Sequence, residues 1–449
     1  FAGSCNADIQ GHTETYIGKN GFPYIRDDVY GGNDLGGRIL GSKSFKSRVQ
    51  NMNMVYGYDQ TNNPDPEVLT ASAYVEYIKG RVDTIFGGCY GYYNYKDDYF
   101  EDYTYSLGNA HAGWAKKGFT KPRMNNAFVN FRPETNSNTY NKVLKIYGAG
   151  QGFPGEEGKD SLQNRSYVLI DIPQEMRTFQ EMEVFGAGAY SGLGMGVTPS
   201  DLVDHKDNSD NVIKGQPDNA SAIIDLMRGR IKDVFGASYK EGVTRRTVVN
   251  VPAASTIYVN RIFGGGYGIS NDVPCDAIET VVNWDSNNAI AEGYRIDEDL
   301  DDDGNLKSGG IYGGNNNFRR TLYSQINVTS MVKQNDAGYS AKVFGAGYGK
   351  NTWAQYTEVN LKSGANVYEA YGGGYGGMVL NKESVAAWAD VYKSLGAGYD
   401  DTDFDDPREN PLFKTNPLGD KTNTNVYINK GATVYGYCYG GGLGADATV

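Results

Sequence analysis

The sequence predicts an all-β chain, a parallel β-helix or β-solenoid with glycine-tyrosine corners and loop insertions. Three observations predict this fold class. A short strand-and-glycine motif recurs along the chain, its copies are spaced like the units of a solenoid, and a second alternating strand precedes several of them. The 449 residues include 60 glycines and 36 tyrosines, a composition that fits a narrow β structure with a polar surface better than a thick core.

The clearest copy of the motif runs from Asn366 to Gly377. Its first strand position is Val or Ile in nearly every copy, with Ala370 as the exception, and its second is Tyr or Phe. Consecutive strand residues point to opposite faces, so we expect the aliphatic side chain in the core and the ring in an outer aromatic row. Close copies begin at Ile85, Ile262, Val343 and Val434, looser copies at Val29, Val55, Ile146, Val184, Val234 and Ile311, and degenerate copies at Ser106 and Ser394.

Glycines follow the ring in these copies, where they supply positive φ or let a neighbouring backbone come close. Gly-Gly-Gly after Phe263 and Gly-Ala-Gly after Phe344 are interchangeable, which indicates that side-chain size sets the limit. The glycine after the ring recurs 26 residues apart from Gly31 to Gly57 and 28 residues apart from Gly236 to Gly264. Longer gaps indicate the same unit carrying an insertion, and each unit is predicted to contain a strand, a turn, a second strand and a glycine corner.

The predicted domain organisation is an N-terminal cap or tether over residues 1–28 and a solenoid over 29–449. Residues 127–131 and 167–172 are predicted strands, and residues 385–392 alternate in a way that favours a strand over a helix. No cap is evident after the last corner, so we expect the final rung to be covered by something else or the protein to continue. Loop insertions are predicted near 90–105, 200–219, 271–310 and 400–423.

The net charge limits the kinds of molecule that this protein is expected to bind. A net charge of −12 argues against nucleic acid, because phosphate binding needs a basic surface. The chain has no run of 18 apolar residues, so we predict no membrane span. No signal peptide is visible, although the sequence fits a mature form that has lost one.

Four cysteines leave several pairings open. Cys89 and Cys438 are predicted to occupy the same position in their repeats, although many copies apart, so they are not expected to touch within one solenoid. A disulfide between Cys5 and Cys89, a bond between chains, and buried free thiols that include Cys275 all remain possible readings.

An acidic segment predicts the one metal site. Asp299, Asp301, Asp303 and Asn305, with Gly304 among them, match the first half of an EF-hand-type calcium loop, in which oxygen ligands converge around a glycine turn. The twelfth position is Gly310 instead of the bidentate glutamate. The alternative is a solvated acidic loop. Residues 401–405 show a similar alternation of aspartates without the glycine.

Catalytic signals are weak. The three histidines, His12, His111 and His205, are isolated from one another and from the cysteines, as expected for surface side chains. Residues 230–232 match one short element of the polygalacturonase family, whose companion Asn-Thr-Asp and Gly-His-Gly elements are absent. Paired acids at 97–98, 302–303 and 405–406 lie in predicted loops. A β-helix polysaccharide lyase or hydrolase acting on an acidic glycan is therefore the alternative function.

The Gly-Gly-Gly-Tyr-Gly corners after alternating strands resemble those of glycine-rich parallel β-helix proteins that bacteria secrete or display as adhesins, surface-layer components or fibres. The resemblance covers roughly 29–449 and implies a noncatalytic structural or adhesive role, outside the cell or on its surface. Two kinds of partner are expected: copies of the same chain through the solenoid ends, or a glycan stacked on the tyrosines. Rings that only stack on one another to stabilise the fold are the alternative to glycan binding.

Overall fold

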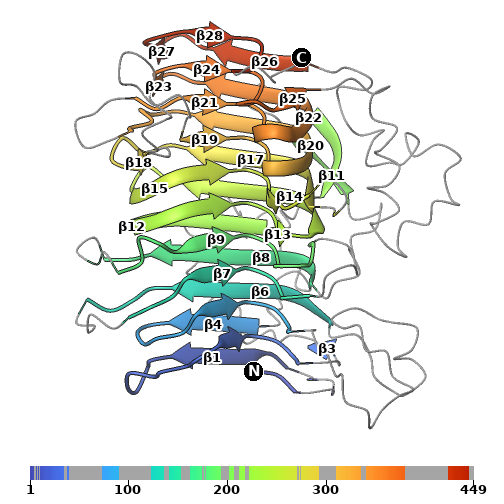
Figure 1. Ribbon diagram of the computed structural model, residues 1–449, viewed down its shortest axis with the longest axis vertical. Coiled ribbons are helices and arrows are strands. Elements are labelled where there is room, and N and C mark those ends of the chain that lie inside the picture. Colours follow the sequence, from blue (N-terminus) through green and yellow to red (C-terminus); the bar gives the residue numbers. More distant parts are fainter. Residues whose placement is uncertain are drawn as a thin grey trace, which may run out of the picture.

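The computed structural model describes residues 1–4, 7, 9, 11–34, 38–39, 73–90, 123–135, 141–152, 162–173, 176, 178–193, 202–206, 212–217, 222–270, 273, 275–292, 310–334, 340–379 and 423–443. Within these ranges the protein is all-β, without a helix, and most strands join one large parallel sheet (Figure 1). This confirms the predicted all-β class, and the parallel order of the strands is consistent with a solenoid.

One side of the protein is a wall of ten long strands, each pairing in parallel with the next along the chain. We call it the long-strand wall. Its members are β1 (Thr13–Ile17), β4 (Ala73–Tyr77), β6 (Arg123–Phe131), β8 (Leu162–Asp171), β12 (Ala222–Phe235), β14 (Gly242–Val251), β17 (Cys275–Trp284), β20 (Asn316–Val328), β22 (Tyr348–Leu361) and β26 (Asn423–Ile428).

A second wall contains the short strands that carry the repeated motif, again in chain order and in parallel. We call it the short-strand wall, and we call one long strand with its following short strand a rung. Its members are β2 (Asp28–Tyr30), β5 (Thr84–Phe86), β7 (Lys145–Tyr147), β9 (Glu183–Phe185), the end of β12, β15 (Thr256–Phe263), β19 (Ile311–Tyr312), β21 (Val343–Phe344), β24 (Ala370–Tyr371) and β28 (Cys438–Tyr439).

The remaining strands are short and lie at the corners or in an insertion. Those in the corners and turns are β3 (Arg38–Ile39), β13 (Tyr239–Lys240), β16 (Tyr267–Gly268), β18 (Ile290–Ala291), β23 (Asn366–Val367), β25 (Met378–Val379) and β27 (Thr433–Val434). β10 (Leu202–Lys206) and β11 (Val212–Pro217) form an antiparallel pair within the insertion predicted near 200–219. Within the insertion predicted near 271–310, β17 belongs to the parallel sheet.

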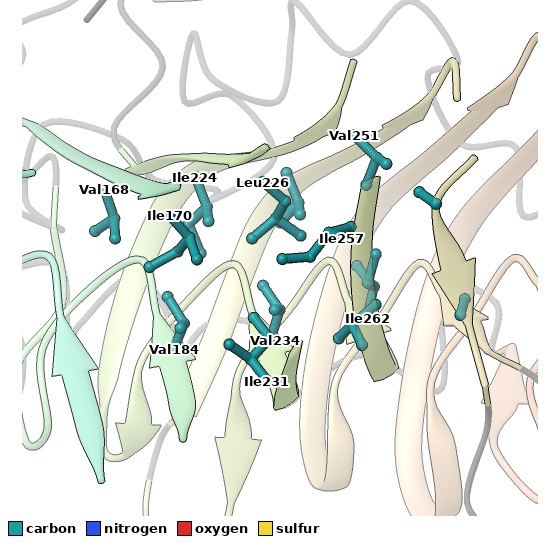
Figure 2. Packing of buried hydrophobic residues seen from close by; sticks show 14 of the residues in the cluster. Val168, Ile170, Val184, Ile224, Leu226, Ile231, Val234, Val251, Ile257 and Ile262 are labelled. Atoms are coloured by element: carbon teal, nitrogen blue, oxygen red, sulfur yellow. The ribbon is translucent and has the colours of Figure 1, made fainter. Parts of the chain in front are cut away.

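The aliphatic core fills the space between the walls. Figure 2 shows Val168 and Ile224 of the long-strand wall pointing toward Val184 and Val234 of the short-strand wall. The Val or Ile of the motif is buried in the described copies from Val29 to Val343, as predicted, and Val434 packs against the same core partly buried. Burying one such side chain contributes about 1.5–3 kcal/mol, so each rung adds a similar increment.

The motif rings are buried as well in every described rung but the last, where Tyr439 is exposed, and this corrects the expectation of an outer row. They lie on the opposite face of the short strands from Val or Ile, as predicted, but Phe185 and Phe263 are 0% exposed. They form a second cluster that partly buried tyrosines of the glycine corners cover. The alternation of the strand predicted the face correctly, whereas the covering residues come from the chain beyond the corner.

The corner glycines are required by close approach between rungs. A Cβ on Gly264 would lie 2.3 Å from the carbonyl oxygen of Gly313 and 2.9 Å from Cβ of Thr280. That carbonyl also accepts a hydrogen bond from the Thr280 hydroxyl at 2.5 Å. The predicted limit on side-chain size at this position is therefore confirmed.

The last rung has a different register from the predicted one. Val434 pairs with Val367, and Tyr439 pairs with Tyr371, so the ring of the final copy is Tyr439 and not Tyr435. Cys438 therefore precedes the ring, whereas Cys89 lies three residues after Phe86, and the two cysteines do not share a repeat position. The copies predicted at Val55, Ser106 and Ser394 and the strand predicted at 385–392 lie outside the described residues.

Candidate functional site

A continuous column of stacked rings runs along the short-strand wall. Neighbouring ring centroids lie 4.6 to 5.2 Å apart, with interplanar angles of 4 to 16°. Aromatic pairs of this kind contribute about 0.5–1.5 kcal/mol each beyond their burial. We call this set the inner ring column; it consists of Phe1, Tyr30, Phe86, Tyr147, Phe185, Phe235, Phe263, Tyr312, Phe344, Tyr371 and Tyr439.

A second aromatic row covers the inner ring column. Each member is a tyrosine that follows the corner glycines, and each is half-buried. Tyr375 packs edge-on against Phe344 at 6.0 Å and 83° and stacks on Tyr348 at 5.2 Å and 8°, and it stays half-buried. We call this set the corner tyrosine row; it consists of Tyr90, Tyr190, Tyr239, Tyr267, Tyr348 and Tyr375.

Charged residues lie beside these rings in several rungs, most of them two positions before the inner ring. They pair across neighbouring rungs: Arg261 with Asp233 at 2.8 Å, and Lys342 with Glu369 at 3.0 Å. Glu183 is shared by Lys232 at 2.9 Å and Lys145 at 3.7 Å. The sequence analysis did not identify these residues, because their type changes from rung to rung. Their common offset from the ring was the available signal.

Cations also lie directly over the corner tyrosines. The Lys145 ammonium is 3.9 Å from the centroid of the Tyr239 ring, and the Lys240 ammonium is 5.0 Å from the same centroid. Lys240 Nζ donates to the Tyr190 hydroxyl at 3.0 Å, and this hydrogen bond raises the pKa of Lys240 above its ordinary value. Lys240 is therefore charged at neutral pH.

A polar ladder crosses the outer face of the long-strand wall. The side-chain amides of Asn360, Asn327 and Asn283 each donate to the asparagine of the preceding rung, at 3.2, 2.9 and 2.9 Å. Asn250 ends the series by donating to the buried Asp225 at 2.7 Å, and Tyr167 donates to the other oxygen of that carboxylate. Burial raises the pKa of Asp225 to about 6, although both hydrogen bonds favour its charged form.

The predicted calcium ligands Asp299, Asp301, Asp303 and Asn305 lie outside the described residues, as does the acidic segment 401–405. Calcium at this loop therefore stays a prediction. Within the described ranges, no three His, Cys, Asp or Glu side chains come together in a way that could hold a metal ion.

The residues that suggested an enzyme are engaged in contacts between rungs. The Arg230 guanidinium lies 4.7 Å from the Tyr258 ring centroid, and Lys232 bonds Glu183. The paired acids at 97–98, 302–303 and 405–406 lie outside the described residues. His12 contacts the Glu14 carboxylate at 2.9 Å, and His205 belongs to β10.

Two of the cysteines differ in environment. Cys275 is a fully buried free thiol, and burial raises its pKa well above the ordinary value, which makes it a poor nucleophile. Cys438 is an exposed free thiol. The proposed partner Cys5 lies outside the described residues.

Comparisons with protein-family models, with curated proteins and with solved structures found no match to this chain. The described part of the chain forms no helix of the length and apolar character that crossing a membrane requires.

Proposed function

We propose that this protein is a noncatalytic β-solenoid that serves as an extracellular structural or adhesive element and binds glycans along its corner tyrosine row. The solenoid is supported by two parallel walls that follow chain order and enclose one aliphatic core. The extracellular location rests on the resemblance of the glycine corners to those of secreted bacterial β-helix proteins.

The corner tyrosine row is the observation that carries glycan binding. Tyr190, Tyr239 and Tyr267 follow one another on successive rungs, and Tyr348 and Tyr375 form a second run, stacked at 5.2 Å and 8°. Asn316 takes the corner position between the two runs. The inner ring column already fixes the rings, so little conformational entropy is lost when a sugar ring stacks on them.

The test is a glycan array probed with the wild-type protein and with the double variant Tyr348→Ser/Tyr375→Ser. We expect the double variant to lose roughly tenfold or more in affinity, the effect of about 1.4 kcal/mol. Tyr435→Ser is the matched control, because Tyr435 is 63% exposed and lies outside the row. A double variant that stays folded and binds like the wild type would contradict the proposal, as would a wild-type protein that binds no glycan.

The alternative of a lyase or hydrolase is tested separately. Incubation with acidic polysaccharides should produce neither new reducing ends nor unsaturated products if the role is noncatalytic. Product formation that persists through repurification would overturn the noncatalytic part of the proposal.

Self-assembly through the solenoid ends is the second proposed role. Five exposed large hydrophobic side chains fall within the last described rung: Tyr427, Ile428, Tyr435, Tyr437 and Tyr439. A second copy would bury this surface. Electron microscopy with and without calcium and reductant tests the role, because filaments support it and single short rods at high concentration contradict it.

A further inference from the structure

Two lysines and two tyrosines form a compact group on the corner tyrosine row. Lys145 projects from β7 and Lys240 from β13, and both ammonium groups lie over the Tyr239 ring. Lys240 also lies 5.2 Å from the Tyr190 ring centroid and bonds its hydroxyl. We call Lys145, Lys240, Tyr190 and Tyr239 the lysine patch.

The lysine patch has more positive charge than its described neighbours neutralise. Glu183 lies closer to Lys232 than to Lys145, at 2.9 Å against 3.7 Å. Within the described ranges, no carboxylate forms an ion pair with Lys240, whose bonded partner is the neutral hydroxyl of Tyr190. Two like charges near one ring repel each other, and an anion that contacts both would relieve that repulsion. A local excess of positive charge is unexpected in a chain whose net charge is −12.

The backbone at Lys240 is strained. Its φ is 70°, in the left-handed region that glycine adopts readily and lysine does not. Glycines with positive φ follow the corner tyrosines at Gly349 and Gly376, with φ of 101° and 66°, and Asn317 takes the equivalent place in another rung at 74°. Glycine would adopt this backbone conformation at lower cost than lysine. We therefore infer that the Lys240 side chain has a role that offsets the strain.

We propose that the lysine patch binds the carboxylate or sulfate groups of an acidic polysaccharide. This inference rests on the proposed glycan-binding function and names the ligand class. The ammonium groups of Lys145 and Lys240 contact the anionic group, and the adjoining sugar stacks on Tyr267 of the next rung, whose ring lies 5.5 Å from that of Tyr239. Neutral polysaccharides lack the group that the two ammonium ions require.

Lys240→Gly is the decisive variant, because it removes one charge and the backbone strain together. Binding is measured with polygalacturonate for the carboxylate, dextran sulfate for the sulfate, and dextran as the neutral polymer. We expect the wild type to prefer one or both acidic polymers over dextran and to bind more weakly as salt increases. Lys240→Gly should lose roughly tenfold in affinity while its unfolding temperature rises.

Asn317→Gly is the matched control. It places glycine at the equivalent corner position of another rung without changing the charge, so it should leave binding unchanged. Lys145→Gln is the second test, and we expect it to weaken acidic binding without loss of fold.

Three outcomes would overturn the inference. Lys240→Gly and Lys145→Gln could both bind acidic polymers like the wild type. The wild type could bind dextran as well as the acidic polymers, which would leave glycan binding intact and reject the acidic class. The wild type could bind none of the polymers and no glycan on the array, which would reject both proposals.

Discussion

The Tyr267 ring packs edge-on against Phe235, with centroids 5.8 Å apart and planes at 90°, although Phe263 is the inner ring of its own rung. The same offset recurs where Tyr348 meets Tyr312, at 5.5 Å and 79°. These corner tyrosines therefore reach back to the preceding rung. Neighbouring rungs are joined by an aromatic contact in addition to their backbone hydrogen bonds, and the inner ring column is closed to water on that side.

The inner ring column is expected to contribute strongly to stability. Phe235→Ala removes a ring that is 1% exposed and stacks on Phe185 at 4.7 Å and on Phe263 at 5.0 Å. We expect a loss of about 3–5 kcal/mol in the free energy of unfolding, measured by urea denaturation. Tyr24→Ala, at a ring that is 63% exposed, should change it by less than about 0.5 kcal/mol. Similar losses in both variants would show that the column contributes little.

The corner glycines are expected to tolerate no side chain. Gly264→Ala places a Cβ 2.3 Å from the Gly313 carbonyl oxygen, which is backbone and cannot rotate away. We expect a loss of about 1–3 kcal/mol from overpacking, read from the same urea transitions. Gly11→Ala is the control, because a Cβ there would meet nothing within 4 Å. A Gly264→Ala protein as stable as its Gly11→Ala counterpart would refute this account of the corner.

The sequence predicted the contacts that depend on local spacing. Alternation placed Val184 in the core and Phe185 on the opposite face, and the invariant smallness after the ring predicted the close approach at Gly264. Contacts between rungs escaped prediction, because insertions change the number of residues from one rung to the next. Asn250 and Asn283 bond each other across 33 residues, and the Val-Asn pair that recurs at both places was the signal that could have predicted this contact.

The register of the final rung is a second feature that the sequence alone did not predict. Tyr371 lies four positions after Val367, but Tyr439 lies five positions after Val434, although the two rungs pair at both places. The motif at Val434 imitates the usual copy, and only backbone pairing reveals the extra residue. The aromatic row expected on the outside consisted of the motif rings, which are buried, and the corner tyrosines take that outer place instead. Lys145 and Lys240 were not singled out, since neither belongs to the repeated motif.

A buried ion pair at the start of β20 gives a third prediction. Asp276 is 0% exposed and receives the Arg319 guanidinium through two hydrogen bonds, at 3.2 and 2.7 Å. Arg319→Ala leaves a buried carboxylate without its cation, so we expect the free energy of unfolding to fall by about 3–5 kcal/mol. Arg228→Ala breaks a pair whose arginine side chain is 50% exposed, and should cost at most about 1 kcal/mol. Equal costs for the two variants would contradict a special role for the buried pair.

Asp225 is expected to make stability depend on pH. Its pKa is about 6 in the folded protein, against an ordinary value of 3.8, because burial opposes the charged carboxylate. A folded-state pKa above the unfolded value means that the extra stability is complete below the unfolded pKa and is lost as the pH rises through the folded one. At about 1.4 kcal/mol for each unit, the wild type should lose roughly 3 kcal/mol relative to a variant without this titration.

Asp225→Asn supplies that reference, because its amide is neutral at every pH and its oxygen can still accept from Asn250. The free energy of unfolding of each protein is measured by urea denaturation from about pH 4 to about pH 8, and the difference between them is followed. The wild type should weaken relative to Asp225→Asn as the pH rises from about 4 to about 6, between the ordinary pKa and the folded-state pKa of the carboxyl, and the difference should be constant above that. A constant difference across the range would mean that the carboxyl is not destabilised by its burial, and that Asn250 and Tyr167 fully compensate it.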